Sequence, residues 1–316
     1  MRRRLLAAVL AAGAAVLGWS APASAAAGDP IHAAPYVDMG SWPTPSLTDM
    51  ASASGVKSYT LAFITASGCK AMWFNAYDPR DAWGKDQVDA IRAGGGDVKI
   101  SFGGASGIEL AQACSDVGAL TAEYKAVVDA YGLRYLDVDI EGSAVAEPAS
   151  IARRSQALAQ LQQQEPGLKI SLTLPVLPMG LTADGLNVVQ SAVSAGVDLD
   201  MVNIMAMDYY QDVDYGDAAV QAATSTEGQL RSILGVSDAW SRLGVTPMLG
   251  QNDDHHVFDQ SDLSQLVSFA RGKHLGMLSF WEMTRDRNAC TGATYQCTNV
   301  PQAPYDFSKI LAGYSG

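Results

Sequence analysis

The sequence is short of positive charge. Its 316 residues include 21 lysines and arginines against 33 aspartates and glutamates, which gives a formal net charge of −12 at pH 7. A chain with this balance is repelled by the polyphosphate backbone of DNA or RNA. Nucleic acid is therefore not an expected partner.

The sequence also lacks the motifs of several common enzyme classes. Among its four histidines only His255 and His256 are adjacent, and neighbouring side chains of an extended segment point apart, so no metal site is expected. Ser106 lacks the GxSxG surroundings of a nucleophile. The Gly103–Gly107 segment does not have the GxGxxG spacing of a dinucleotide-binding loop. We therefore expect chemistry without a metal ion or an organic cofactor.

Long apolar runs are absent except at the N-terminus. There Arg2–Arg4 precede an apolar stretch from Leu5 to Trp19, and Ala23-Ser24-Ala25 follows. This pattern predicts a secretory signal peptide over residues 1–25, and removal of its arginines changes the net charge to −15. A membrane anchor is the alternative, but the run is shorter than the ~20 residues that span a bilayer. A secreted, extracellular protein without a membrane segment is expected.

Cysteine is scarce, and the four cysteines form no CxxC motif and no zinc-binding spacing. An even number of cysteines in an exported chain predicts two disulfides. Four cysteines allow three pairings, and proximity in the sequence favours Cys290 with Cys297 and leaves Cys69 with Cys114.

No linker, low-complexity run or change of composition divides residues 26–316. Instead, a short apolar strand followed by a helix-like stretch recurs eight times. The expected strands are Ala34–Asp38, Ser58–Ile64, Val98–Phe102, Tyr135–Ile140, Lys169–Leu174, Met201–Ala206, Thr246–Gly250 and Gly276–Trp281. Eight such units predict a single-domain (β/α)8 TIM barrel, with a doubly wound open sheet as the alternative.

Three carboxylates alternate with apolar residues in the fourth expected strand. Asp137, Asp139 and Glu141 would share one face of the strand, while the residues between them face the other way. Crowded acids in a poorly solvated site raise at least one pKa, which keeps a proton available for general acid catalysis. A solvated edge strand with an acidic outer face is the alternative. In a barrel, by contrast, the C-terminal ends of the strands carry the active site, and Glu141 would lie there.

The sequence at three of these strand ends resembles glycoside hydrolase family 18, the chitinases. The family signature DxxDxDxE is similar to Arg134–Glu141, with Arg134 in place of the first acid. Ser101–Gly104 looks like the family's SxGG, and Met205–Asp208 is similar to its MxYD with Met207 in place of the tyrosine. With its LDVDIEG and MAMDYY motifs, the chain resembles most a bacterial and archaeal branch of single-domain chitinases.

The resemblance implies a retaining reaction in which the substrate supplies the nucleophile. Glu141 would protonate the leaving glycosidic oxygen while the 2-acetamido oxygen of the bound sugar attacks C1. Asp139 would orient the acetamido N–H and stabilise the positive oxazolinium ion, and Asp137 would share a proton with Asp139. Glu141 would then deprotonate the incoming water.

Seven further residues complete the expected site. Tyr209 is expected to replace the missing tyrosine as donor to the acetamido oxygen, because it lies two residues from Met207 on the same face of an extended segment. Trp281 matches the family tryptophan on which the C–H face of a sugar stacks. The other expected substrate-binding residues, for some of which a simple turn or packing role is the alternative, are Asp208, Asp253, Gly103, Gly104 and Trp42.

These features predict a secreted, monomeric endo-chitinase that hydrolyses β-1,4 bonds between N-acetylglucosamine units. The expected ligands are chitin and N-acetylglucosamine oligosaccharides. One alternative is a non-catalytic chitin-binding lectin on the same barrel, against which the presence of Glu141 argues. Another is an endo-β-N-acetylglucosaminidase that cuts N-glycan cores with the same acids.

Overall fold

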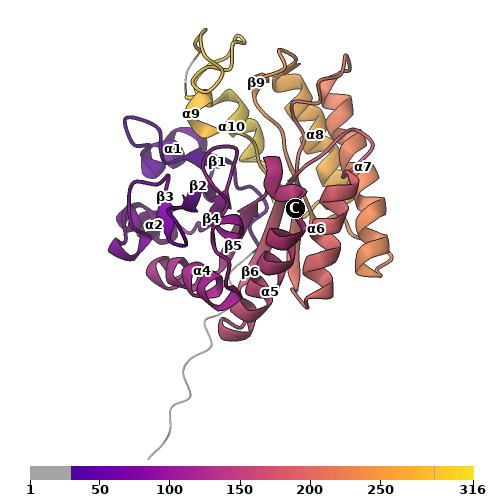
Figure 1. Cartoon of the computed structure of the whole chain (residues 1–316). Helices are drawn as coiled ribbons and strands as arrows, with labels where there is room; N and C mark the ends of the chain where they lie inside the picture. Colours follow the sequence, from indigo (N-terminus) through magenta and orange to yellow (C-terminus); the bar gives the residue numbers. More distant parts are fainter. Residues whose placement is uncertain (1–29, 288) are drawn as a thin grey trace, which may run out of the picture. The chain divides into compact units, whose positions relative to one another are not determined.

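The computed structural model describes residues 30–287 and 289–316. The chain divides into two units, residues 1–30 and 31–316, and the labelled helices and strands belong to the second (Figure 1). The predicted signal peptide at 1–25 lies outside the described residues.

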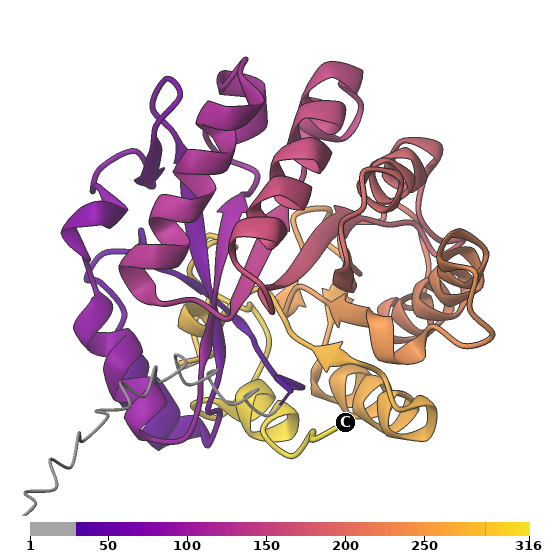
Figure 2. The ribbon, with the colours of Figure 1, turned by 90° about the horizontal axis from the view of Figure 1, so that it is seen from below.

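Parallel strands form a closed sheet in the second unit, in the order β1-β2-β4-β5-β6-β7-β8-β11. They are β1 (Tyr36–Asp38), β2 (Tyr59–Ala66), β4 (Val98–Gly103), β5 (Tyr135–Asp139), β6 (Lys169–Pro175), β7 (Leu199–Met205), β8 (Leu243–Thr246) and β11 (Met277–Leu278). The Ala34 amide donates to the Leu278 carbonyl at 3.1 Å, which joins the last strand to the segment before the first. The predicted (β/α)8 barrel is thus confirmed, with strands at the centre and helices around them (Figure 2).

The helices follow the strands along the chain. They are α1 (Leu47–Ser54), α2 (Lys85–Ala93), α3 (Leu110–Ala113), α4 (Val117–Tyr131), α5 (Pro148–Gln164), α6 (Ala183–Ser194), α7 (Tyr215–Leu234), α8 (Gln260–Lys273), α9 (Met283–Asp286) and α10 (Asp306–Leu311). Polar caps fix where several of them begin. At α8, the Asp259 side chain accepts from the Asp262 amide and the Asp262 side chain accepts from the Asp259 amide, which forms a capping box.

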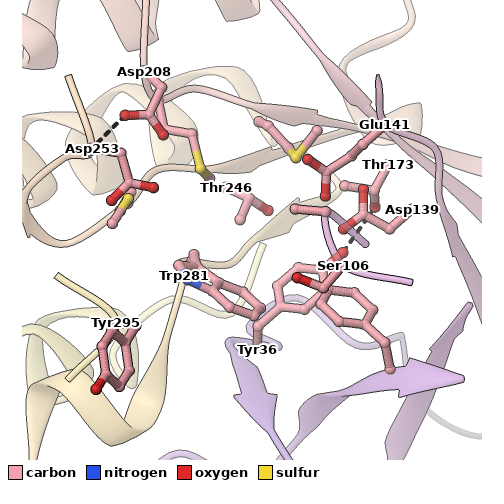
Figure 3. A pocket seen from close by; sticks show the side chains of 15 residues that line it. Tyr36, Ser106, Asp139, Glu141, Thr173, Asp208, Thr246, Asp253, Trp281 and Tyr295 are labelled. Atoms are coloured by element: carbon pink, nitrogen blue, oxygen red, sulfur yellow. Dashed lines mark hydrogen bonds between the residues drawn. The ribbon is translucent and has the colours of Figure 1, made fainter. Parts of the chain in front are cut away.

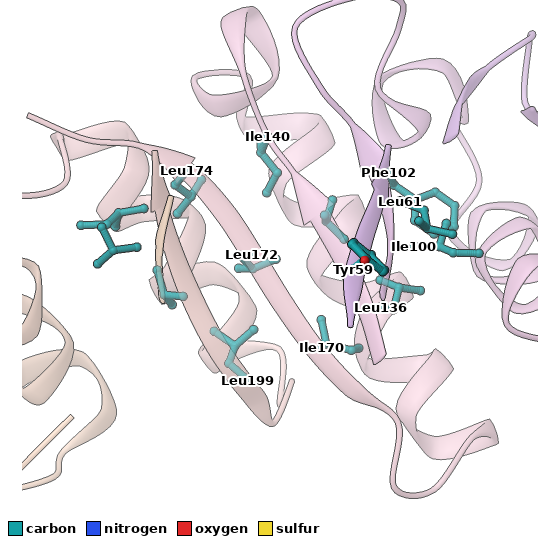
Figure 4. Close-up of a cluster of buried hydrophobic side chains, with 14 of the residues drawn as sticks. Tyr59, Leu61, Ile100, Phe102, Leu136, Ile140, Ile170, Leu172, Leu174 and Leu199 are labelled. Atoms are coloured by element: carbon teal, nitrogen blue, oxygen red, sulfur yellow. The ribbon is translucent and has the colours of Figure 1, made fainter. Parts of the chain in front are cut away.

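Strand β5 separates its acids from its apolar residues as the sequence predicts. Leu136 and Val138 are fully buried and belong to the apolar cluster that packs between the sheet and the helices (Figure 4). Asp137 and Asp139 are also buried, but the partners of Asp137 come from β1, β4 and β6, across the barrel interior. Because β5 pairs with β4 on one side and β6 on the other, a solvated edge strand is excluded.

The seventh expected strand is displaced. The sequence pattern predicted Thr246–Gly250, whereas β8 ends at Thr246. Pro247 follows, and it has no amide hydrogen to continue the ladder. Gly250 instead begins a small antiparallel hairpin outside the barrel. The strands that were not predicted are β3 (Ala71–Trp73), which pairs antiparallel with β2, and the hairpin strands β9 (Gly250–Gln251) and β10 (Val257–Phe258).

The disulfide pairing favoured by proximity is confirmed. Cys69 is bonded to Cys114, which ties the β2–β3 turn to the end of α3. Cys290 is bonded to Cys297, which closes a loop after α9. Among the described residues no cysteine is free. In the same ranges, no helix has both the length and the apolar character needed to cross a membrane.

Candidate active site

Asp137 lies at the base of the site and is held by four hydroxyl groups. Its Oδ2 atom accepts from Tyr36 at 2.9 Å and from Ser101 at 2.7 Å. Its Oδ1 atom accepts from Ser171, and from Thr173 at 2.9 Å. Because these donors come from three strands of the barrel, the orientation of the carboxylate is fixed. Asp137 itself does not line the cavity above it.

Asp139 and Glu141, next along the same chain segment, are hydrogen-bonded to each other. Burial raises the pKa of Asp139 well above its usual value, and the charges of Glu141 and Asp137 raise it further. Burial also raises the pKa of Glu141, although its hydrogen bond with Asp139 opposes this shift. Because these two carboxyl groups share a hydrogen bond, we infer that they titrate as a pair. The Oδ1 atom of Asp139 is buried and has no hydrogen-bond partner among the described residues.

A cavity of ≈ 300 Å³ opens beside these acids at the C-terminal ends of the strands. It brings together five residues predicted from the sequence, namely Asp139, Glu141, Asp208, Asp253 and Trp281 (Figure 3). Its other lining residues are Tyr36, Phe63, Ala105, Ser106, Thr173, Met205, Met207, Thr246, Met248 and Tyr295. Carboxylates and hydroxyls therefore face a partly aromatic, partly aliphatic surface, which suits a ligand with both polar groups and apolar faces.

Trp281 presents a flat apolar surface in this cavity, and its position is held on two sides. Its ring stacks on Phe63, with centroids 5.6 Å apart and planes 16° from parallel. Its amide donates to the Pro247 carbonyl at 2.8 Å, and its carbonyl accepts from the Leu249 amide at 3.0 Å. The indole is thus fixed before any ligand arrives.

Asp208 and Asp253 face each other on the side of Trp281 away from Glu141 (Figure 3). The Oδ1 atom of Asp208 accepts from the Asp253 amide at 2.8 Å and from the Asp254 amide at 3.2 Å. Burial raises the pKa of Asp208, while these amide hydrogen bonds oppose the shift. The two loops after β7 and β9 are therefore fastened to each other at the edge of the cavity.

Tyr209 does not line the cavity, and the premise used to select it is wrong. The prediction assumed an extended segment, but Asp208 and Tyr210 have φ angles of 47° and 53°, in the left-handed region, so the alternation of faces does not apply. Met207 lines the cavity instead. Tyr209 packs against the ring of Tyr215 at 5.1 Å, and its buried hydroxyl has no partner among the described residues.

Gly103, Gly104 and Trp42 also lie outside the cavity lining. A Cβ atom on Gly103 would lie 2.0 Å from the Asp139 carbonyl oxygen, and one on Gly104 would lie 2.7 Å from the Phe63 ring. The φ angles of these glycines, 100° and 84°, also favour glycine. Gly103 and Gly104 therefore allow the Asp139 backbone and the Phe63 ring to pack closely against this segment. Trp42 is 91% exposed.

Several lining residues were not selected from the sequence. Tyr36 and Thr173 alternate with apolar residues on β1 and β6, so the period-two rule applied to β5 could have found them. Tyr295 belongs to an irregular loop and gives no such signal. No group of three or more His, Cys, Asp or Glu residues within 30–287 and 289–316 is placed to hold a metal ion.

Comparisons with known proteins agree on one family, although no family model matches the chain. The chain is 36% identical over 306 residues to the probable bifunctional chitinase/lysozyme of Escherichia coli (strain K12), covering 89% of this chain and 34% of that protein. It is 36% identical over 271 residues to endochitinase 11 of Metarhizium anisopliae, covering 80% of this chain and 52% of that protein. The chain therefore spans about a third and about half of the lengths of these two relatives.

Solved structures extend the similarity to a whole domain. A catalytic-site mutant of active domain 2 of the chitinase from Pyrococcus furiosus has a TM-score of 0.84 and 33% identity, covering 92% of this chain and 99% of that one. A GH18 chitinase from Pseudoalteromonas aurantia shares the fold, with a TM-score of 0.61 at 17% identity. The chain therefore belongs to the chitinases of glycoside hydrolase family 18.

Proposed function

We propose that the chain is a secreted, retaining endo-chitinase that cleaves β-1,4 bonds between N-acetylglucosamine units with the help of the substrate's own acetamido group. The observation that carries this proposal is that the buried Oδ1 atom of Asp139, a residue that lines the same cavity as Trp281, has no hydrogen-bond partner among the described residues. A buried acceptor without a donor is uncommon in folded proteins. The acetamido N–H of a sugar stacked on Trp281 is the donor that would satisfy it.

Glu141 is the proposed general acid. Its raised pKa keeps a proton on the pair that it forms with Asp139, and it lies at the edge of the cavity where a glycosidic oxygen would leave. As this proton moves to the leaving oxygen, the acetamido oxygen attacks C1 to give the oxazolinium ion. Glu141 then removes a proton from water, so the anomeric configuration is retained.

Asp139 and Asp137 are the proposed electrostatic support of this step. Once Asp139 gives up its share of the proton, its negative charge faces the positive oxazolinium ion. Asp137, fixed by four hydroxyl groups, lies next along the strand, and its charge contributes to the raised pKa of Asp139. This sequence of events needs no metal ion or organic cofactor.

Tyr209, Asp208 and Asp253 are the proposed sugar contacts besides Trp281. Tyr209 does not line the cavity, but it remains the candidate donor to the acetamido oxygen because its buried hydroxyl has no partner among the described residues. Asp208 and Asp253 line the cavity and carry acceptors suited to sugar hydroxyls. For Gly103 and Gly104 we propose a supporting role, and for Trp42 contact with a more distant part of the polysaccharide.

We also propose that residues 1–25 direct export and that residues 26–316 act as a monomeric catalytic domain. The Arg-rich start, the apolar run and Ala23-Ser24-Ala25 support export. The two disulfides agree with an oxidising compartment outside the cytosol.

Product analysis tests the proposal. The protein is incubated with chitin hexamer and, separately, with a glycoprotein that carries N-glycans, and Glu141→Gln serves as the inactive control. Internal cleavage of the hexamer, with the β-anomer appearing first in the NMR spectrum, is the expected result. Release of intact N-glycans without cleavage of the hexamer would assign the chain to the endo-β-N-acetylglucosaminidases. Binding without cleavage would make it a lectin.

A further inference from the structure

The loop closed by the Cys290–Cys297 disulfide carries Tyr295 to the wall of the cavity. Within this loop the amides of Gln296 and Cys297 both donate to the Ala293 carbonyl, at 2.9 and 3.0 Å, which forms a tight turn. Tyr295 lies in that turn, and its side chain lies beyond Trp281 as seen from Glu141 (Figure 3). The loop therefore presents an aromatic ring next to the catalytic sugar position.

The loop is fastened to the segment that carries Asp253. The Thr294 hydroxyl donates to the Asp253 carboxylate at 2.6 Å. Asn299 donates from its side-chain amide to the Gln251 side chain at 2.8 Å and to the Gly292 carbonyl at 3.0 Å. These hydrogen bonds join the loop to the turn after β9, and the segment that follows the loop to β9 itself, so the position of Tyr295 does not depend on the disulfide alone.

A buried arginine and a glycine also hold the end of the disulfide-closed loop against β9. The fully buried Arg285 donates to the Gln251 carbonyl at 2.8 Å and to the Cys297 carbonyl at 3.2 Å. A Cβ atom on Gly250 would lie 2.1 Å from the Thr298 carbonyl oxygen, so only glycine allows the chain after the loop to return so closely. These contacts hold the loop in a fixed position in the cavity wall.

Tyr295 is nevertheless 70% exposed. No other aromatic ring among the described residues packs against it. An ordered, exposed aromatic ring at the mouth of a site with polar and apolar lining is suited to stack on the C–H face of a pyranose. The acids of the site repel anionic ligands but not an uncharged sugar.

We propose that Tyr295 forms a second sugar-binding subsite, which holds the pyranose unit adjacent to the one on Trp281 and makes the disulfide-closed loop a determinant of chain-length specificity. This inference rests on the proposed function, because it takes the substrate to be a chain of N-acetylglucosamine units. The Thr294–Asp253 hydrogen bond couples the two subsites, since Asp253 lines the catalytic cavity.

The test measures kcat/KM on chitin oligomers of increasing length for wild type, Tyr295→Ala, Tyr295→Phe and Tyr295→Trp. We expect Tyr295→Ala to lose roughly tenfold on the oligomers long enough to reach the loop, about 1.4 kcal/mol of binding in the transition state. Short substrates that reach only from the Trp281 position to the leaving group should be cleaved as by wild type. The two aromatic variants should keep the wild-type profile.

Tyr210→Ala is the matched control, because Tyr210 is another exposed tyrosine, at 76%, that does not line the cavity. It should leave the length profile unchanged. A second variant, Thr294→Val, keeps the tyrosine but removes the hydrogen bond to Asp253, and should weaken the preference for long oligomers in the same direction. Thermal unfolding confirms that each variant is folded.

The outcomes separate the two claims. If wild type cleaves no chitin oligomer, the proposed function fails. If wild type cleaves them but Tyr295→Ala keeps the same length profile, the subsite is wrong while the function stands. An equal loss on short and long substrates would assign Tyr295 to the catalytic sugar instead, and a loss in Tyr295→Phe equal to that in Tyr295→Ala would overturn stacking as its contribution.

Discussion

The Nζ atom of Lys99 lies 3.5 Å from the Ser171 hydroxyl, and that hydroxyl donates in turn to Asp137. Lys99 is only 2% exposed, inside the barrel beneath the acid cluster. Burial lowers its pKa, and the negative charges of Asp137 and Asp200 oppose this shift. A buried cation therefore lies under the carboxylates and connects to them through one serine.

Lys99→Met should move the pH profile of kcat/KM to higher pH. Loss of the cation makes negative charge in the cluster more costly, so the pKa of Asp139 should rise further. The protein should remain folded, because an apolar side chain of similar length avoids the cost of a buried charge. Lys169→Met removes an exposed lysine, which pairs with Asp200, and should leave the profile unchanged. A lower Tm with an unshifted profile would mean that Lys99 has only a structural role.

Asp208→Asn should move the alkaline limb of the kcat/KM profile to lower pH. Glu141 must carry a proton to act as the acid, so activity falls as pH rises through its pKa. Burial raises that pKa, and the charge of Asp208 adds to the shift. Removal of that charge lowers the pKa of Glu141, and the proton is lost at lower pH. Asp253→Asn is the control, because Asp253 does not contribute to the shift of Glu141; an equal movement in both variants would contradict the argument.

The period of two in Asp137–Glu141 was sufficient to predict both the barrel strand and the gathering of its acids. This pattern is local, since each side chain's face is set by its neighbours in the strand. The disulfide pairing could also be predicted from the sequence, because pairing Cys290 with its neighbour Cys297 left only Cys114 as a partner for Cys69. Trp281 was found through family resemblance rather than from its own surroundings.

Other parts of the site depend on contacts that no local pattern encodes. Tyr36 donates to Asp137 across 101 positions of the sequence. Tyr209 lies outside the cavity wall because Asp208 and Tyr210 adopt left-handed φ angles. Such angles are uncommon for residues other than glycine, so the sequence did not indicate this turn. Tyr295 is held at the cavity by long-range hydrogen bonds from its loop to Asp253 and from the segment after the loop to Gln251.

Tyr209→Phe should lower kcat by about 10²- to 10³-fold if its hydroxyl donates to the acetamido oxygen in the transition state. The same change should not lower Tm, because it removes a buried hydroxyl that has no partner among the described residues. Tyr215→Phe is a comparison variant, since the Tyr215 hydroxyl donates to Asp254 and accepts from the Tyr209 amide. It should lose stability. Near-normal turnover of Tyr209→Phe would remove Tyr209 from the mechanism.

Glu141→Gln and Asp139→Asn should both be severely impaired on chitin oligomers, for different reasons. The first cannot deliver a proton to the leaving oxygen, and the second loses the negative charge that stabilises the oxazolinium ion. A nitrophenyl glycoside separates them, because nitrophenolate needs little protonation to leave. Its pre-steady-state release should be partly restored in Glu141→Gln, whereas Asp139→Asn should stay slow on both kinds of substrate. If both variants hydrolyse chitin oligomers at the wild-type rate, the acid lies elsewhere and the proposed reaction is wrong.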